Sequence, residues 1–235
     1  MKSRRQFMKQ GALVTTALFA AKPFKTFSGV GSSLSGGNYN HLVFLHTAEN
    51  DIPAFGKIAG YINTIKSGSP GTILVHSGKK DPGMYDFDIS SAESKQLPEY
   101  DIVAKNGVNA GVIFIKEGEA NAVEKVNQLA ALLKKEKDCQ LVVCISQLGY
   151  QHKFAMDDTK LAVGSQHLDL IIGGHPENFT AKTMVLRNSM KHEVIIQSSK
   201  GNERDCSKIE FSFDNAGSKK HVHVATRLYK HAVTA

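Results

Sequence analysis

Side chains capable of chemistry follow short apolar runs at several points of the sequence. The clearest case is DLIIGGHPEN, residues 169–178, in which an apolar run ends in two glycines followed by His175, Pro176 and Glu177. Loops at the carboxyl ends of strands build the active sites of α/β sheets, so Gly-Gly-His places an imidazole where metals or phosphates are usually bound. Four other apolar runs end in polar segments: HTAENDI (46–52), VHSGKKD (75–81), SQLGYQH (146–152) and SSKGNERD (198–205).

Seven apolar runs predict the strands that position these segments. Most are continuous and rich in β-branched residues, which is typical of strands buried on both faces. They cover residues 41–47, 71–77, 110–116, 140–146, 168–174, 193–199 and 208–214. The weak alternation from His221 onward predicts an additional edge strand. Residues 79–106 are rich in Pro, Gly, Ser and Asp and predict a long surface connection.

Two amphipathic segments predict helices over residues 55–67 and 119–137. Apolar residues recur at helical spacing, as Ile58, Ile62 and Ile65 in the first segment and as Val123, Val126, Leu129, Leu132 and Leu133 in the second. Strands and helices alternate at first, and the strands then follow one another directly. This order predicts α/β layers at the front of the chain and antiparallel sheet at the back, in one domain.

The charge of the chain is concentrated at its start. The net charge is +7, but residues 1–30 hold six Lys or Arg and no acid, so +1 remains on residues 31–235. The basic charge therefore belongs to the leader, and we expect no nucleic-acid partner. The 41% of hydrophobic and 22% of charged residues are ordinary for a globular protein with a sizeable core.

The first thirty residues resemble a twin-arginine export signal. Arg4 and Arg5 stand within Ser-Arg-Arg-Gln-Phe-Met-Lys, ahead of a mild apolar run, Gly11 to Ala21. That run is too short for a membrane span, which needs ~20 residues. We expect a signal peptide over 1–30, a Ser/Gly-rich linker over 31–40 and a periplasmic or otherwise extracytoplasmic mature protein. The alternative is a basic amphipathic first helix.

The three cysteines do not form a C-x-x-C motif. Cys144 lies in an apolar run and is predicted to be a small core residue. A disulfide between Cys139 and Cys206 is the one pairing that the sequence leaves open.

Taken in order, the strand-end segments resemble the metallophosphatase domain of the 5′-nucleotidase family, within the calcineurin-like phosphoesterases. The resemblance includes VEKVNQLAALLKKEKDCQLVVCISQLGY (123–150) and LDLIIGGH (168–175), and it covers most of residues 41–214. It is closest to short exported relatives that carry this domain alone. The resemblance implies a layered α/β/β/α sandwich over 41–235. It also implies a site in which two divalent ions activate a bridging water to attack phosphorus.

The family's metal-ligand motifs are altered in this sequence. The family's D-x-H after the first strand falls on Glu49-Asn50-Asp51, and the aspartate of its G-D falls on Lys79. S-H-L-G has become Ser146-Gln147-Leu148-Gly149, and H-x-H has become His175-Pro176-Glu177.

Two further positions also depart from the family. Residues 79–106 contain no histidine for the family's Asn-His pair, and His76 stands where relatives have an acid. The resemblance therefore implies a remnant cleft made of Glu49, Asp51, His76, Lys79, Gln147, His175 and Glu177.

Lys79 is the most informative of these changes. Two divalent ions beside its ammonium would be repelled by several kcal/mol at contact distance, even at an effective dielectric constant of about 20. We therefore expect no dinuclear centre and no cofactor. Two placements of Lys79 stay open: it neutralises Glu49, Asp51 or Glu177 in a salt bridge, or it points to water beside Lys80.

A single metal ion is the alternative. Glu49, Asp51, His175 and Glu177 keep the two i, i+2 spacings of the family's ligands and suit one Mn²⁺, Mg²⁺ or Ca²⁺ ion. Two functions follow from the resemblance. The favoured one is a catalytically degenerate binding or regulatory homologue, whose partner is a separate 5′-nucleotidase substrate-domain protein, an active paralogue or a nucleotide. The other is a residual metal-dependent phosphoesterase acting on nucleotides or other phosphomonoesters.

Overall fold

The computed structural model describes residues 40–47, 52–77, 85–88, 98–153, 155–174, 183–198 and 205–228. The chain divides into two units, Met1–Ser35 and Gly36–Ala235, and all described residues belong to the second. The predicted signal peptide lies outside the described residues. No helix among the described residues is long and apolar enough to cross a membrane.

The strands form two sheets. The first has the order β11 (Lys219–Leu228), β10 (Asp205–Phe213), β1 (Asn40–Thr47), β2 (Thr72–His76) and β3 (Phe87–Asp88). The second has the order β4 (Tyr100–Lys105), β5 (Val108–Ile115), β6 (Leu141–Ser146), β7 (Leu170–Gly173), β9 (Glu193–Ser198) and β8 (Met184–Arg187). Strands β1 to β3 are parallel to one another, as are β5, β6, β7 and β9, whereas β10, β11, β4 and β8 pair antiparallel.

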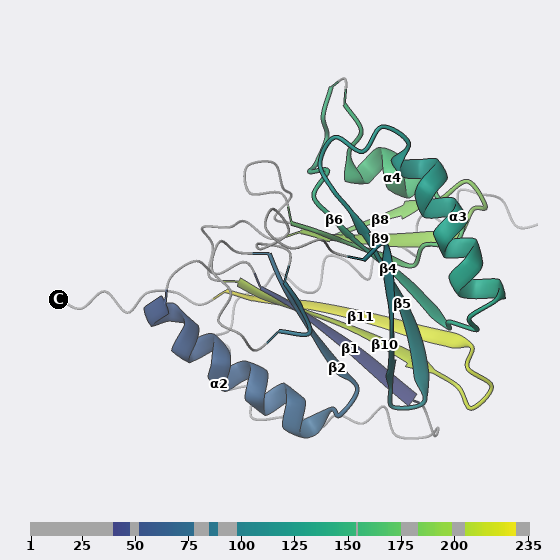
Figure 1. Ribbon diagram of the computed structural model, residues 1–235. Coiled ribbons are helices and arrows are strands. Elements are labelled where there is room, and N and C mark those ends of the chain that lie inside the picture. The colour runs from purple at the N-terminus through teal and green to yellow at the C-terminus, as the bar shows by residue number, and fades with distance from the viewer. Residues whose placement is uncertain are drawn as a thin grey trace, which may run out of the picture. The chain divides into compact units, whose positions relative to one another are not determined.

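Helices cover the outer face of each sheet. Helix α2 (Ile52–Gly68) packs on the first sheet, and α3 (Ala122–Lys135) and α4 (Asp158–Gly164) pack on the second (Figure 1). Strand alternation explains the layers, because Leu42 and Phe44 of β1 point between the sheets while Val43 and Leu45 point to α2. The α/β/β/α sandwich and its continuous apolar strands are as the sequence predicted.

Several elements differ from the sequence predictions. The surface connection predicted over 79–106 is wrong in part, because it contains β3 and β4, and β4 pairs antiparallel with β5 over Tyr100–Lys105. Helix α4 and strand β8 were not predicted. The candidate edge strand near the end of the chain is confirmed as β11, which pairs with β10.

The apolar stripe predicted for helix α3 is confirmed in part: Val126 and Leu133 are buried, and Val123 and Leu129 pack against the same core. Its buried residues are Ala122, Val126, Ala130 and Leu133, whereas Val123, Leu129 and Leu132 are only partly buried. Small residues let the helix approach β5 closely. A Cβ on Gly111 would lie 2.7 Å from Leu133 Cδ1, so glycine makes room for this leucine.

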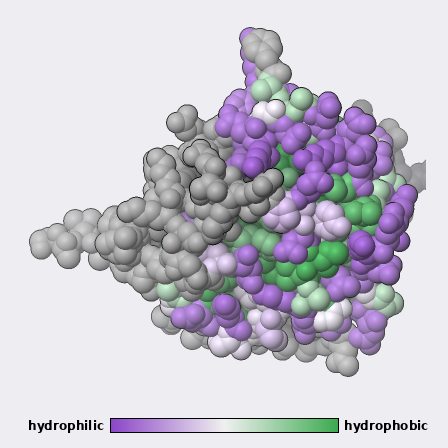
Figure 2. Space-filling view, in the orientation of Figure 1, coloured by the Kyte–Doolittle hydropathy of each residue, from purple (hydrophilic) through white to green (hydrophobic). Residues whose placement is uncertain are grey.

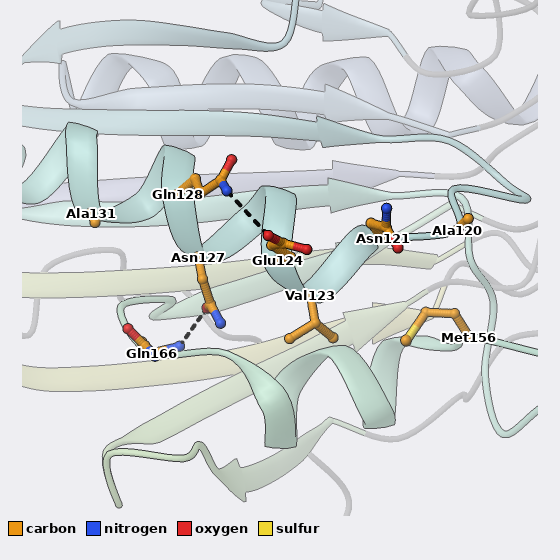
Figure 3. A pocket seen from close by; sticks show the side chains of 9 residues that line it. All are labelled: Ala120, Asn121, Val123, Glu124, Asn127, Gln128, Ala131, Met156 and Gln166. Atoms are coloured by element: carbon orange, nitrogen blue, oxygen red, sulfur yellow. Dashed lines mark hydrogen bonds between the residues drawn. The ribbon is translucent and has the colours of Figure 1, made fainter.

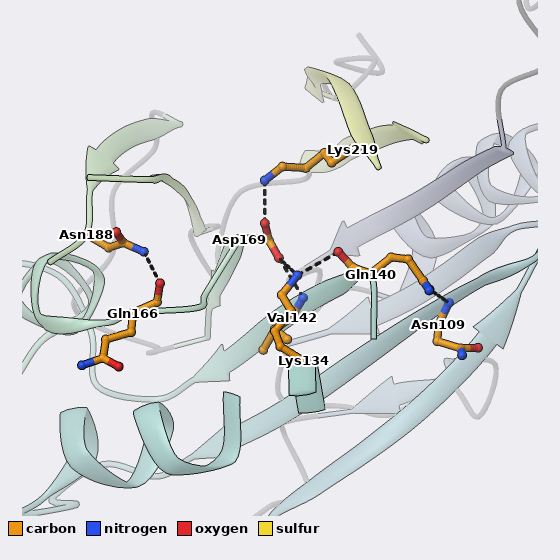
Figure 4. Close-up of polar contacts among 8 residues, drawn as sticks. All are labelled: Asn109, Lys134, Gln140, Val142, Gln166, Asp169, Asn188 and Lys219. Carbon is orange, nitrogen blue, oxygen red and sulfur yellow. Dashed lines mark hydrogen bonds and ion pairs between the residues drawn. The ribbon is translucent and has the colours of Figure 1, made fainter. Parts of the chain in front are cut away.

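A buried carboxylate joins the helix layer to both sheets. Asp169 Oδ2 accepts hydrogen bonds from Lys134 Nζ at 2.9 Å and from the Val142 backbone N–H at 2.9 Å, and Lys219 Nζ pairs with Asp169 Oδ1 (Figure 4). Burial alone would raise the pKa of Asp169, but Lys134 and Lys219 outweigh it and hold the pKa below its usual range. This cluster ties α3 and β6 to β11 at the end of the sandwich opposite to the carboxyl end of β7.

The three cysteines are buried, and none of them is in a disulfide. Cys139 lies in the core between the second sheet and its helices, and Cys206 lies in the core under α2. The disulfide that the sequence left open is therefore not formed. Cys144 is a core residue, as predicted.

Candidate functional site

The structure describes two of the seven residues in the predicted cleft, His76 and Gln147. The other five lie outside the described residues: Glu49, Asp51, Lys79, His175 and Glu177. The strand ends from which these residues follow are described.

The carboxyl ends of the two sheets meet on the same side of the sandwich. Gln197 of β9 donates from Nε2 to Ser207 Oγ of β10 at 2.9 Å, and both side chains are buried. Ser207 stands opposite His46, next to the end of β1. The segments that leave β1, β2, β6, β7 and β9 therefore start from one rim, as the position of active sites in α/β sheets predicts.

Two groups of side chains, buried or half-buried, lie at the ends of β1 and β2. His46 Nε2 and Ser77 Oγ form a 2.9 Å hydrogen bond, and Thr47 Oγ1 lies 3.2 Å from His76 Nδ1 and 2.8 Å from the Tyr85 hydroxyl. The His76 ring stacks on Tyr85, with centroids 4.7 Å apart. The side chain at position 76 is thus packed into the protein.

His46 is kept neutral at the end of β1. Burial, reinforced by His76, lowers the pKa of His46 to about 3. His46 is the penultimate residue of β1 and has no solvent exposure, so its imidazole supports the strand end and does not titrate near neutral pH.

The rim of the second sheet is joined by short backbone hydrogen bonds. Gly174 N–H donates to the Ser146 carbonyl at 2.7 Å, and Gln147 N–H donates to the Ile115 carbonyl at 2.9 Å. Gln147 is half-buried. Its neutral amide stands where the resemblance places an imidazole ligand, and an amide is a poorer donor for transition metals than an imidazole.

Asp158 is a buried carboxyl at this rim that the sequence analysis missed. It is 1% exposed, accepts a hydrogen bond from the Ser146 hydroxyl, and its backbone N–H donates to the Gly149 carbonyl at 2.8 Å. Burial raises the pKa of Asp158 to about 7; the Ser146 hydrogen bond opposes this rise and Asp157 adds to it. The signal in the sequence was the Asp157-Asp158 pair. Asp157 caps α4 by accepting hydrogen bonds from the Thr159 and Lys160 N–H groups, so the second acid of the pair is left without a capping role.

The described His46, His76 and Asp158 side chains at the rim are held by contacts with neighbouring residues. The imidazoles of His46 and His76 are buried and bonded to Ser77 and Thr47, and the buried carboxyl of Asp158 bonds to Ser146 and lies against Gly173. Within the described part of the chain, no three His, Cys, Asp or Glu side chains are grouped so that they could hold a metal ion.

A groove of about 640 Å³ lies along α3 (Figure 3). Asn127 Oδ1 accepts a 2.9 Å hydrogen bond from Gln166 N–H, and Gln128 Nε2 lies 3.5 Å from Glu124 Oε1. Glu124 is the only ionisable side chain among its lining residues, and none of these residues belongs to the predicted cleft. Figure 2 shows hydrophilic and hydrophobic residues interspersed on the face that is in view in Figure 1.

Comparison with solved structures gives the fold class. Haemophilus influenzae NAD nucleotidase matches with a TM-score of 0.62 at 10% identity, over 81% of this chain and 50% of that one. A 5′-nucleotidase precursor from Thermus thermophilus matches with a TM-score of 0.52 at 15% identity, over 80% of this chain and 54% of that one. A phosphatase from Mycoplasma pneumoniae matches with a TM-score of 0.51 at 10% identity, over 82% of this chain and 95% of that one.

The chain therefore has the metallophosphatase fold of the 5′-nucleotidase type, as its sequence resemblance predicted. It spans about half the length of the two nucleotidases. No family model and no curated protein matches the sequence.

Proposed function

We propose that this chain is an exported metallophosphatase-fold protein that binds its ligand at the strand-end rim without hydrolysing it. The main support is the group of Thr47, His76 and Tyr85. At position 76 the resemblance places an acid, and here an imidazole stacks on Tyr85 and bonds to Thr47. The end of β2 therefore supplies no carboxylate from its last residue.

Lys79 supports the same proposal through charge. It follows β2 by three positions, where the resemblance places the aspartate that bridges two metals. An ammonium repels a divalent ion, whereas it attracts a phosphate or a carboxylate. A rim that carries Lys79 suits an anionic ligand held without metal.

The proposed ligand is a nucleotide, or a partner protein that carries nucleotide-binding residues. The chain corresponds to about half of the NAD nucleotidase and of the 5′-nucleotidase precursor. A separate substrate-domain protein or an active paralogue would supply the other half. The leader, with Arg4 and Arg5, supports an extracytoplasmic location for this interaction.

A hydrolysis assay tests the absence of turnover. Purified protein is incubated with nucleoside monophosphates and with an aryl phosphate, in Mn²⁺, Mg²⁺ or Ca²⁺, and phosphate release is compared with that of His175→Ala. We expect equal, background rates for both proteins. Hydrolysis that His175→Ala abolishes would contradict the proposal and support the residual single-metal phosphoesterase that uses Glu49, Asp51, His175 and Glu177.

Thermal unfolding tests ligand binding separately. A nucleoside monophosphate at saturating concentration should raise the melting temperature by an amount that follows the mass-action relation for one site. Lys79→Met should weaken this stabilisation, and Lys80→Met is the matched control at the neighbouring lysine. Stabilisation that is equal in both variants would exclude Lys79 from the binding site.

A further inference from the structure

Asp158 occupies the centre of the rim of the second sheet. Its carboxyl accepts from the Ser146 hydroxyl at the end of β6, and Ser146 Oγ in turn accepts from Leu148 N–H at 3.1 Å. Its backbone N–H donates to the Gly149 carbonyl at 2.8 Å. One residue thus connects the end of β6, the segment that follows it and the start of α4.

The same carboxyl lies directly against β7 and β9. A Cβ on Gly173 would stand 2.6 Å from Asp158 Oδ2 and 2.9 Å from Ser198 Cβ, so the three residues are in tight contact. The next residue, Gly174, donates its N–H to the Ser146 carbonyl at 2.7 Å. Any change in the size or solvation of the Asp158 carboxyl therefore acts on the ends of β6, β7 and β9 together.

The surroundings of Asp158 disfavour a negative charge. Asp158 Oδ1 has no hydrogen-bond partner among the described residues, and no described cation contacts this carboxyl. The ionisable groups that face it are Asp157, which precedes it and pairs with Lys160, and the buried thiol of Cys144 on β6. From β7 and β9 the facing residues are Gly173 and Ser198, which carry no charge.

We propose that Asp158 is a pH-responsive clamp on these three strand ends. The neutral carboxyl packs under Gly173 and holds Ser146 to the start of α4, whereas the ionised carboxyl draws in water and loosens the contact. This proposal does not rest on the proposed function, because the clamp is independent of which ligand binds at the rim.

The direction of the pH effect follows from the raised pKa. Asp158 has a pKa of about 7 in the folded protein against 3.8 ordinarily, so the folded state holds the proton more tightly than the unfolded state. The stability that Asp158 contributes is fully present below about pH 4 and is lost as pH rises through about 7.

The test compares wild type with Asp158→Asn, which keeps the shape of the neutral acid and cannot ionise. We expect the folding equilibrium constant of wild type, relative to that of Asp158→Asn, to fall by about tenfold or more between pH 5 and pH 8. Hydrogen exchange of the Gly174 amide provides the local readout. Its protection should fall over the same range in wild type and stay constant in Asp158→Asn.

Asp157→Asn is the matched control on the neighbouring acid. Asn retains the cap. Because the Asp157 charge helps to raise the pKa of Asp158, Asp157→Asn should keep the decline in stability and move it to lower pH. If Asp158→Asn does not fold, Ser146→Ala replaces it. Because the Ser146 hydroxyl lowers the pKa of Asp158, the stability of Ser146→Ala should decline at a higher pH than the stability of wild type. The proposal would be overturned if the ratio of the wild-type folding equilibrium constant to that of Asp158→Asn did not change with pH. Equal loss of Gly174 amide protection in wild type and Asp158→Asn would also overturn it.

Discussion

The imidazole of His76 lies on the phenol ring of Tyr85, with ring centroids 4.7 Å apart and planes inclined by 23°. The hydroxyl of Tyr85 is 2.8 Å from Thr47 Oγ1, which also lies 3.2 Å from His76 Nδ1. The ends of β1 and β2 are therefore joined by side-chain stacking and hydrogen bonding. This packing occupies position 76 at the rim where a metallophosphatase of the resembled family holds an acid.

Tyr85 should contribute to stability mainly through its ring. Tyr85→Ala removes the stack on His76 and the contact with the core under α2, and we expect it to lower the free energy of unfolding by about 2–3 kcal/mol. Tyr85→Phe keeps the ring and loses the hydrogen bond to Thr47, at a cost of about 1 kcal/mol. Urea unfolding measures both variants. Equal costs would mean that the stack on His76 contributes nothing.

Gly173 should not tolerate a side chain. A methyl group there meets Asp158 Oδ2 and Ser198 Cβ inside 3 Å, and both belong to buried residues. We expect Gly173→Ala to destabilise the protein by about 1–3 kcal/mol. Gly60→Ala is the control, because no atom lies within 4 Å of a Cβ at that position in α2. It should stabilise the protein by about 0.5–1 kcal/mol. Chemical denaturation that gave both substitutions the same sign would refute this account of Gly173.

Asp169 should make the protein sensitive to acid. Asp169→Asn leaves Lys134 and Lys219 without their shared carboxylate. We expect it to lower the free energy of unfolding at pH 7 by about 2–4 kcal/mol. This loss is smaller than the loss expected on breaking a fully buried ion pair, because both lysines are partly exposed. Because its pKa is lowered, the stabilisation is present above about pH 4 and lost as pH falls through the folded value.

The melting temperature measured from pH 7 to pH 2 checks this prediction. The difference between wild type and Asp169→Asn should shrink as the pH falls. Asp214→Asn, which alters the exposed pair with Lys220 at 2.8 Å, should have a smaller effect at pH 7. A difference for Asp169→Asn that is the same at pH 2 and pH 7 would exclude the ion pairs as its cause.

Lys79 should differ from Lys80 in its effect on stability. If the Lys79 ammonium neutralises Glu49, Asp51 or Glu177, Lys79→Met leaves an acid without its partner and lowers the melting temperature, whereas Lys80→Met does not. Thermal unfolding of the two variants at low ionic strength is the measurement. Identical melting temperatures for wild type and Lys79→Met would remove the ion-pair hypothesis and leave Lys79 facing water.

The apolar strands were predictable because continuous β-branched runs indicate strands that are buried on both faces. Strand β1, for example, begins one residue before its predicted range. Strand β4 was not predicted. It follows a stretch rich in Pro, Ser and Asp, none of its residues is fully buried, and it pairs only with β5. In α3 the predicted stripe is right at Val126 and Leu133, but it missed the buried Ala122 and Ala130. The close approach at Gly111 favours a face of small residues with Leu133, which periodicity does not reveal.

The site was predictable in part. The polar segments that follow the apolar runs indicated where the rim lies, because parallel strands bring their carboxyl ends to one edge of a sheet. The roles of Thr47, Tyr85 and Asp158 were not predictable, since each depends on a contact between segments distant in sequence. Asp158 is the clearest case, because Asp157 beside it is equally buried, and only the contact of Asp158 with Gly173 sets it apart from this capping residue.

Manganese occupancy tests most directly the claim that Lys79 has replaced the metal-bridging acid. Crystals of the protein soaked in Mn²⁺ and measured at the manganese absorption edge should show no pair of ions at the strand-end rim. Two fully occupied manganese sites about 3.5–4 Å apart, bound among Glu49, Asp51, His175 and Glu177, would contradict the account.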